Sequence, residues 1–138
     1  MLDDILINKM AIIHNCLKRI LEEYCGHEEE LEYNYTKQDS IVLNLQRACE
    51  ASIDLGMRII RIRKLEIPQQ SREVFAILEK HQLISSKVSQ QMQAMVGFRN
   101  IAVREYQKLS LAIVRSILTN HLTDFREFME AIRLLVGP

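Results

Sequence analysis

The amino-acid sequence predicts an all-α protein, an antiparallel bundle of four long helices with one extra short helix between the second and the third. Apolar residues recur at intervals of three and four along most of the chain, and no segment alternates as a strand would. The 138 residues include only 4 Gly and 2 Pro, so few interior positions interrupt a helix. A chain of this length can bury a core without disulfides or a structural metal, and we expect a single domain spanning 1–138.

The first helix is predicted from an apolar stripe whose members are spaced alternately by four and three residues. This stripe consists of Leu6, Met10, Ile13, Leu17, Ile20 and Tyr24. Asp3 and Asp4 fall in the first turn, where carboxylates stabilise the positive end of the helix dipole. Gly26 is a natural helix stop, and residues 27–32, four of which are Glu, are expected to form a solvated acidic connector.

The second helix is expected to be capped by Thr36 or Asp39. Its apolar line runs through Ile41, Leu45, Ala48, Cys49, Ser52, Leu55, Gly56 and Ile59. The small residues on and beside this line would let another helix approach closely, either within the protomer or across a dimer interface. The helix is expected to end by Ile67, because the residue before Pro68 is pushed out of the α region.

Charged groups on the second helix leave two interpretations open. Glu50 and Asp54 lie four residues apart on one face, where paired carboxylates could do acid–base work or simply form surface ion pairs with Arg47, Arg58 or Lys18. Four cations also crowd the end of this helix: Arg58, Arg61, Arg63 and Lys64. They would complement the helix dipole, and they could alternatively bind phosphate.

The second half of the chain predicts three more helices. A short helix is expected from Ser71, as its cap, through Lys80, with Val74, Phe75, Ile77 and Leu78 as its packing face. Ser85 or Ser86 is expected to cap the next helix, which buries Val88, Met92, Met95, Val96 and Phe98. Ser110 is expected to cap a single last helix with the apolar line Leu111, Val114, Leu118, His121, Leu122, Phe125, Met129, Ile132 and Leu135. His121 is therefore predicted to point into the core or an interface.

The composition excludes several classes of function. With 18 basic and 18 acidic residues the net charge is zero, so any RNA contact must depend on local placement of Arg and Lys. Cys16, Cys25 and Cys49 show no metal-ligand spacing and are expected to be buried free thiols in a reducing compartment. No signal peptide, membrane segment or nucleotide-binding motif occurs, which predicts a cytoplasmic protein.

The stretch from Phe98 to Tyr106 is the one that core packing does not explain. It carries two guanidiniums, an amide, a carboxylate and a phenol within nine residues. On an ideal helix Tyr106 would lie nearly in line with Arg99, with Asn100 and Arg104 forming a neighbouring polar stripe. The residues expected to pack are Phe98, Ile101, Ala102 and Val103. A solvated helix face would account for the same polar groups.

This stretch resembles the signature of the HepT-like toxins of the HEPN superfamily, Arg-x4-His-x-Tyr with Asn directly after the Arg. Arg99, Asn100 and Tyr106 match the signature in identity and spacing, whereas Arg104 occupies the position of the family's His. The resemblance extends along the whole chain, including the flanking segments 39–47 and 67–72.

The resemblance implies the same helical fold and a metal-independent endoribonuclease without a cofactor. Family members act as the toxin of a type VII-like toxin–antitoxin pair and form homodimers in which the signature segments face one another across a cleft. Their antitoxin is a minimal nucleotidyltransferase of the MntA type that adds AMP to the signature Tyr, here Tyr106. Acidic residues on the second helix lie near the signature in the family, so Asp54 is an auxiliary candidate.

The implied chemistry makes Arg104 the decisive departure. Attack by the ribose 2′-OH on phosphorus needs a group that exchanges protons near neutral pH, which His does, and positive charge, which Arg99 supplies. Asn100 would orient either group, and Tyr106 would bind phosphate or stack on a base. Arg104 does not release its proton at neutral pH, so the site is expected to be impaired. The alternative is a non-catalytic helical module that binds a partner protein or a nucleotide.

Overall fold

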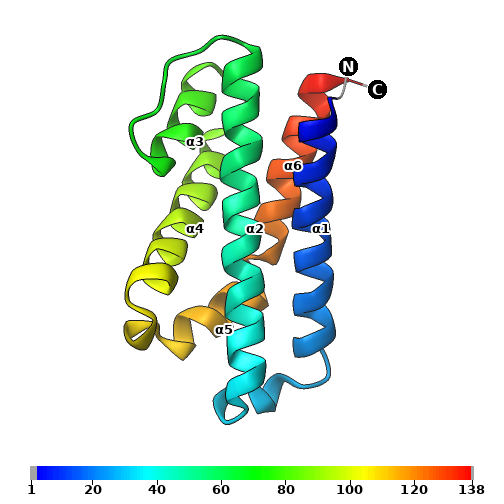
Figure 1. Cartoon of the computed structure of the whole chain (residues 1–138), viewed down its shortest axis with the longest axis vertical. Coiled ribbons are helices and arrows are strands. Elements are labelled where there is room, and N and C mark those ends of the chain that lie inside the picture. The colour runs from blue at the N-terminus through cyan, green and yellow to red at the C-terminus, as the bar shows by residue number, and fades with distance from the viewer. Residues whose placement is uncertain (1–2, 138) are drawn as a thin grey trace.

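The computed structural model describes residues 3–137, which are helical throughout apart from short connections and contain no strand. The elements are α1 (Asp4–Tyr24), the 3-10 helix η1 (Glu28–Glu32), α2 (Tyr35–Ile62), α3 (Ser71–Lys80), α4 (Ser86–Arg104), the 3-10 helix η2 (Tyr106–Lys108), α5 (Leu111–Asn120) and α6 (Leu122–Val136). Figure 1 shows α1, α2, α4 and α6 running antiparallel, with the short α3 beside the start of α4. The predicted all-α bundle, with a short helix between the second and third long helices, is confirmed.

The first helix begins and ends as its sequence indicates. The Asp3 carboxylate accepts a hydrogen bond from the Leu6 amide at 2.9 Å, which caps α1, and Gly26 has a left-handed φ of 81° just after the helix. The predicted stripe is buried except for Met10, which is partly buried. The bond from the Leu6 amide and the neighbouring Arg58 guanidinium, against a smaller opposing effect of desolvation, lower the pKa of Asp3. Arg58 Nη2 lies 2.7 Å from Asp3, so one cation of the predicted basic cluster ties α2 to the start of α1.

The predicted N-caps of two helices, α2 and α3, were wrong. Asn34 caps α2 by accepting from the Lys37 amide at 3.0 Å, and Thr36 and Asp39 lie inside the helix. Gln70 holds the N-cap position of α3 and Ser71 is already its first helical residue, so the Ser71 hydroxyl makes no capping bond and accepts a hydrogen bond from Arg99. Ser85 and Ser110 do cap α4 and α5, as predicted.

The small residues along the apolar line of α2 pack against other helices of the same protomer. A Cβ at Gly56 would lie 2.5 Å from Val74 Cγ1 of α3 and 3.8 Å from the Phe128 ring of α6, so a glycine here permits the close helix contact. Ala48, Ala51 and Ser52 are buried as well. Phe75 and Phe128 then join α3 to α6 through an edge-to-face contact with ring centroids 5.2 Å apart. The alternative that this line forms a dimer interface is thereby excluded.

The prediction of a single last helix was wrong, because the chain breaks at His121 into two helices, α5 and α6. His121 is the C-cap of α5 and the N-cap of α6, and its exposed ring bonds through Nδ1 to the buried Asp124 carboxylate at 2.9 Å. Leu118, Leu122 and Phe125 keep helical spacing across the break, so periodicity does not reveal it. The break lets α5 cross the end of the bundle while α6 packs along it (Figure 1).

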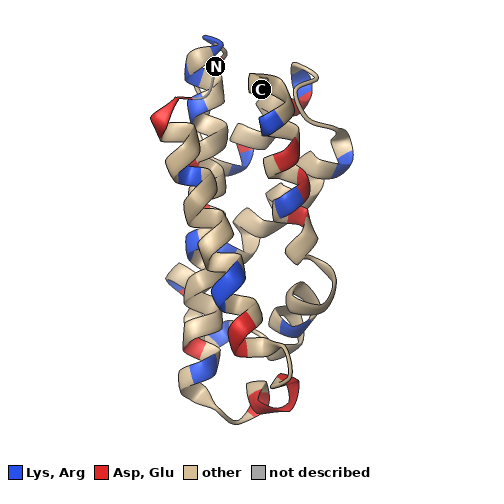
Figure 2. Cartoon of the chain, turned by 90° about the vertical axis from the view of Figure 1, so that its right-hand side faces the viewer, with Lys and Arg blue, Asp and Glu red and all other residues tan. Residues whose placement is uncertain are grey.

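The predicted acidic connector is an ordered element. It forms η1, whose Leu31 is fully buried and whose Leu31 carbonyl accepts a bond from Gln38 Nε2 at 2.5 Å. Figure 2 shows acidic residues concentrated in η1, at the end of the bundle away from the chain termini. Of the three cysteines, Cys16 and Cys49 are buried free thiols as expected, but Cys25 is exposed at the end of α1. Among residues 3–137, no helix is both long and apolar enough to cross a membrane.

Candidate functional site

A groove of about 610 Å³ lies between the start of α3 and α4, the signature helix, which carries Arg99, Asn100 and Arg104. Its lining comes from two distant segments, and consists of Gln69, Gln70, Ser71, Arg72, Val96, Arg99, Asn100 and Arg104. The groove thus brings together three of the predicted site residues, Arg99, Asn100 and Arg104. No carboxylate lines it, and none of its three guanidiniums forms an ion pair within the described part of the chain. This arrangement suits an anionic ligand.

Arg99 is oriented from the opposite side of the groove. Its Nη2 donates to the Ser71 hydroxyl at 3.1 Å, which connects α4 to the start of α3. Its Nε is buried and has no hydrogen-bond partner in the structure. Leaving a buried donor unpaired costs about 1–3 kcal/mol, a cost that a bound anion reaching this atom would remove.

Arg72 is a site residue that the sequence reasoning missed. A Cβ on Gly97 of α4 would lie 2.5 Å from Arg72 Nη2, so the guanidinium occupies the space that a side chain at position 97 would take. The signal was present in the sequence, since Arg72 ends one flanking segment of the family resemblance and Gly97 precedes the signature. Only the packing of α3 on α4 shows that the two belong together.

Tyr106 does not lie where an ideal helix would place it. α4 ends at Arg104, Glu105 adopts φ −142° and ψ 55°, and Tyr106 opens η2. Its hydroxyl therefore does not line the groove but donates to Asp39 Oδ1 of α2 at 2.5 Å. Desolvation, together with the hydrogen bond and the charge of Asp39, raises the pKa of the Tyr106 phenol to about 12. The expectation that Tyr106 aligns with Arg99 was wrong, because the helix ends two residues earlier.

Two residues of the signature segment that were expected to pack into the core are instead exposed to solvent. Ile101 is 38% exposed and Val103 is 51% exposed, whereas Phe98 and Ala102 are buried as predicted. The outer face of the signature helix is therefore partly apolar.

Asp54 is not brought to the groove. Its carboxylate pairs with Lys9 of α1 at 3.1 Å, rather than with the cations expected from the sequence, Arg47, Arg58 or Lys18. It lines a neighbouring hollow that shares the residues of the loop before α3 but none of the signature residues. In the cluster at the end of α2, Arg58 pairs with Asp3, Arg63 contacts the Leu135 carbonyl at 3.5 Å, and none of the four cations lines the groove.

The groove contains no group that exchanges a proton near neutral pH. Its only ionisable side chains are the three guanidiniums. The four histidines lie elsewhere: His27 bonds to Glu30, His81 to Glu66 and His121 to Asp124, and His14 lines a separate hollow beside α1. Within residues 3–137, no cluster of His, Cys, Asp and Glu is arranged to bind a metal ion.

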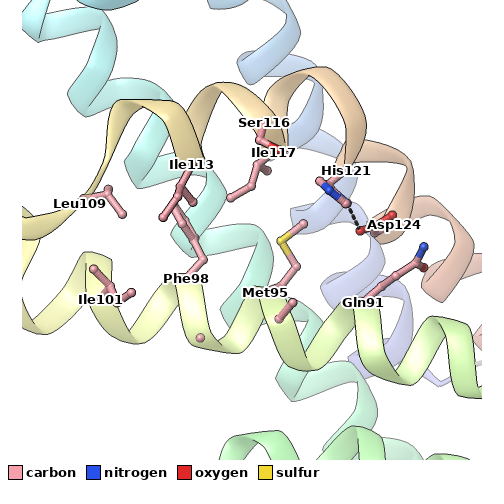
Figure 3. A pocket seen from close by; sticks show the side chains of 12 residues that line it. Gln91, Met95, Phe98, Ile101, Leu109, Ile113, Ser116, Ile117, His121 and Asp124 are labelled. Atoms are coloured by element: carbon pink, nitrogen blue, oxygen red, sulfur yellow. Dashed lines mark hydrogen bonds and ion pairs between the residues drawn. The ribbon is translucent and has the colours of Figure 1, made fainter.

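A second pocket, of about 410 Å³, lies on the other side of α4 and is mostly apolar. Figure 3 shows Met95, Phe98 and Ile101 of α4 facing Ile113 and Ile117 of α5, with His121 and Asp124 at one end. No Lys or Arg lines this pocket, so it does not share the anion-binding character of the groove.

Comparison with known proteins agrees with the geometry. The family model described as Ribonuclease HepT-like matches residues 13–132. The mRNA nuclease HepT of Shewanella oneidensis is 46% identical over 132 residues, which cover 96% of this chain and 98% of that protein.

Solved structures give the same result. A crystal structure of a toxin–antitoxin with AMP-PNP contains a chain with 45% identity and a TM-score of 0.91, covering 94% of this chain and 98% of that one. The tri-AMPylated HEPN toxin of Shewanella oneidensis in complex with MNT antitoxin has 46% identity and a TM-score of 0.90, covering 95% and 98%. The cytosolic protein YutE of Bacillus subtilis, of unknown function, shares the fold at 14% identity with a TM-score of 0.80, covering 95% and 87%. The match over nearly the whole chain in sequence and in structure, together with Arg99, Asn100 and Arg104 in one groove, shows that this chain belongs to the ribonuclease HepT-like family.

Proposed function

We propose that this chain is the toxin of a toxin–antitoxin pair, an endoribonuclease that works in the cytoplasm and binds the RNA backbone in the groove. The observation that carries the proposal is the convergence of Arg72, Arg99 and Arg104 with no carboxylate among them. Guanidiniums bind phosphate oxygens through paired hydrogen bonds, and the unpaired Nε of Arg99 offers one more donor. The 46% identical relative is an mRNA nuclease.

The proposed reaction needs no metal ion. The ribose 2′-OH attacks the adjacent phosphorus, and the bond to the 5′-oxygen breaks. Arg99 and Arg72 stabilise the negative charge that builds on phosphorus, while Asn100 orients the reacting groups. The groove has no carboxylate to hold a divalent cation, so charge stabilisation falls to the guanidiniums. What the groove lacks is the proton-exchanging group that His at position 104 would supply.

RNA binding by the groove is testable through Gly97→Ala. If the three guanidiniums each neutralise one phosphate, log affinity for single-stranded RNA should fall with log salt with a slope of about −2. The methyl group of Gly97→Ala would displace the Arg72 guanidinium, because the two would lie only 2.5 Å apart. We expect weaker RNA binding and a salt slope shallower by about 0.7, measured by fluorescence anisotropy at several salt concentrations.

The same substitution should not destabilise the fold. Alanine is favoured over glycine inside a helix by about 1 kcal/mol, so the melting temperature should stay level or rise. Gln90→Ala, on the exposed face of α4 and outside the groove, is the matched control and should leave both affinity and salt slope unchanged. Unaltered RNA binding by Gly97→Ala would remove Arg72 from the site.

We further propose that the chain forms a homodimer through the signature region. The exposed Ile101 and Val103 give this face an apolar character, and a two-fold axis there would bring two copies of Arg99 and Arg104 together. Sedimentation should show a dimer at micromolar concentration, and Ile101→Asp should shift it toward monomer. A wild-type monomer at that concentration would contradict the proposal.

The proposed antitoxin is a minimal nucleotidyltransferase of the MntA type that adds AMP to Tyr106. Support comes from the solved relative, a tri-AMPylated HEPN toxin in complex with MNT antitoxin. The Tyr106 side chain is 43% exposed on η2, immediately after the helix that lines the groove, where a partner enzyme can reach it. Anionic adducts at this place would obstruct RNA by occupancy and by repulsion of its phosphates.

One observation favours a second candidate function. Because no proton-exchanging group lines the groove, the chain as written could act as a non-catalytic module that binds a nucleotide or a partner protein. The two candidates differ in what His at position 104 would do. It would restore cleavage in a ribonuclease and would have no such effect in a binding module.

A further inference from the structure

We infer that the Asp39 carboxylate accepts the phenolic proton of Tyr106 when Tyr106 takes up AMP, so that the toxin itself supplies the proton acceptor for its own modification. The inference rests on the proposed function in one respect, namely that Tyr106 is the modified residue. It adds a role for a residue of α2 that lies outside the signature. The juxtaposition that carries it is the 2.5 Å contact between the Tyr106 hydroxyl and Asp39 Oδ1.

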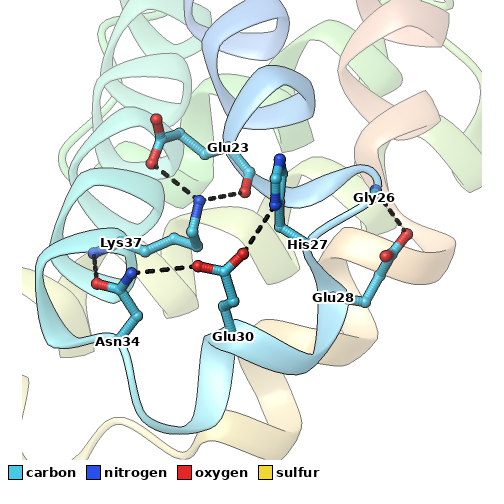
Figure 4. A network of polar contacts seen from close by, with 7 residues as sticks. All are labelled: Glu23, Gly26, His27, Glu28, Glu30, Asn34 and Lys37. Atoms are coloured by element: carbon cyan, nitrogen blue, oxygen red, sulfur yellow. Dashed lines mark hydrogen bonds and ion pairs between the residues drawn. The ribbon is translucent and has the colours of Figure 1, made fainter.

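Both partners of this contact are held by ordered backbone. The start of α2 is fixed by the network in Figure 4, where Asn34 caps the helix and Lys37 Nζ donates to the Glu23 carbonyl at 2.8 Å. Asp39 follows in the second turn of that helix. Tyr106 is held by η2, in which the Leu109 amide donates to the Tyr106 carbonyl at 2.9 Å. The hydroxyl therefore meets the carboxylate because two rigid elements converge.

Asp39 is available to accept a proton. It is exposed and makes no other hydrogen bond or ion pair within the described residues, so its second oxygen faces water and can pass a proton on. The charged groups next to Tyr106 along the chain are Glu105, just before η2, and Lys108, which pair with each other at 3.5 Å rather than with Asp39.

Exposure alone would select a different tyrosine. Tyr33 and Tyr35 are 67% and 73% exposed, against 43% for Tyr106, yet neither bonds to a carboxylate in the part of the chain that the structure describes. Tyr24 is buried, and its hydroxyl accepts a bond from Arg115. The contact with Asp39 is the feature that separates Tyr106 from the other three.

The chemical step balances with ATP as the co-reactant. Tyr106 Oη forms a bond to the α-phosphorus of ATP, the bond from that phosphorus to the bridging oxygen breaks, and pyrophosphate leaves with the electron pair. The phenolic proton passes from Oη to Asp39 and then to solvent. Protein kinases use an Asp in the same way, to accept the proton of the hydroxyl that attacks phosphorus. At neutral pH a tyrosine phenol is protonated, since its ordinary pKa is about 10 and the pKa of Tyr106 is raised further, so a proton acceptor is needed.

The test is Asp39→Asn, which keeps the size and an acceptor oxygen but removes the charge. The full chain is incubated with its nucleotidyltransferase, ATP and magnesium, and AMP addition is timed by intact mass. Loss of the proton acceptor should slow the first addition by about 10²–10⁴-fold. Ultraviolet titration should at the same time show the phenol pKa falling from about 12 toward its ordinary value of about 10.

The two readouts together identify a proton acceptor, because Asp39→Asn should then slow AMP addition even though it lowers the pKa of the phenol. If Asp39 merely suppressed the phenol's reactivity, the lower pKa in Asp39→Asn would make AMP addition faster, and that result would overturn the inference. Equal rates would overturn it as well. Glu50→Gln, which removes another exposed and unpaired carboxylate from α2, is the matched control and should behave as wild type.

Complex formation is measured in parallel by size-exclusion chromatography. Asp39→Asn should still bind the antitoxin, and loss of the complex would overturn the inference, because Asp39 would then be a docking contact. Failure of the wild-type chain itself to gain AMP on Tyr106 would instead refute the proposed function on which the inference rests. The two failures are therefore distinguishable.

Discussion

Replacing Arg104 by His is expected to raise RNA cleavage by about 10²–10⁴-fold, the usual contribution of one positioned acid–base group. The groove already holds the cationic groups that the reaction needs, in Arg72 and Arg99. Its missing part is a group with a pKa near neutrality. His has an ordinary pKa of about 6.5, whereas that of Arg exceeds 12.

The same substitution should leave the fold intact and weaken RNA binding slightly. Arg104 is the exposed last residue of α4, where its charge complements the helix dipole by about 0.3–1 kcal/mol. His carries only part of that charge at neutral pH, so the melting temperature should change little and RNA affinity should fall. Cleavage, affinity and melting temperature are measured in EDTA, which also tests metal independence.

Arg104→Gln is the matched control for this experiment. It removes the guanidinium, as His does, but offers no group that exchanges a proton, so it should remain inactive. Equal cleavage by the wild-type chain and by Arg104→His would show that position 104 does not handle the proton. The groove would then be an RNA-binding surface, and the proposed mechanism would be wrong.

Tyr106→Phe is expected to abolish AMP addition completely. In the proposed reaction the phenolic oxygen is the nucleophile, and Phe offers none. Incubated with the nucleotidyltransferase, ATP and magnesium, the wild-type chain should gain mass in steps of one AMP, whereas Tyr106→Phe should gain none. The substitution also removes the hydrogen bond to Asp39, which is exposed, so its effect on the free energy of unfolding should not exceed about 1.5 kcal/mol.

The controls for this prediction are Tyr33→Phe and Tyr35→Phe, which should accept AMP as the wild type does. Both tyrosines are more exposed than Tyr106, so they test whether accessibility alone decides the target. Peptide mapping that places the adduct on Tyr24, Tyr33 or Tyr35 would contradict the assignment. In the Arg104→His background, AMP addition to Tyr106 should also suppress RNA cleavage.

Helical periodicity predicted most of the core correctly. The stripes of α1, α2, α3 and α4 are buried nearly residue for residue, because a long amphipathic helix has only one face that it can bury. Periodicity was insufficient where the chain changes direction without changing spacing, as at His121, where the apolar pattern continues through a break. It also failed at Ile101 and Val103, whose exposure depends on whether another element covers that face.

The functional site likewise combines features that the sequence predicted with features that it did not. The signature made Arg99, Asn100, Arg104 and Tyr106 recognisable, since identity and spacing along the chain are properties of the sequence alone. Asp54 was not brought to the groove, because its position on α2 places it in a neighbouring hollow, where it pairs with Lys9 of α1.

The sequence by itself thus determined the helical class, the family and the residues of the signature. Only the tertiary structure decided that Arg72 joins Arg99 across the groove, because Gly97 leaves room for its guanidinium when α3 packs on α4. It also decided that Tyr106 turns to Asp39, because α4 ends at Arg104 and η2 redirects the chain toward α2. Helix ends and contacts between distant segments follow from which elements pack together, and that information is spread over the whole fold rather than encoded in any local pattern.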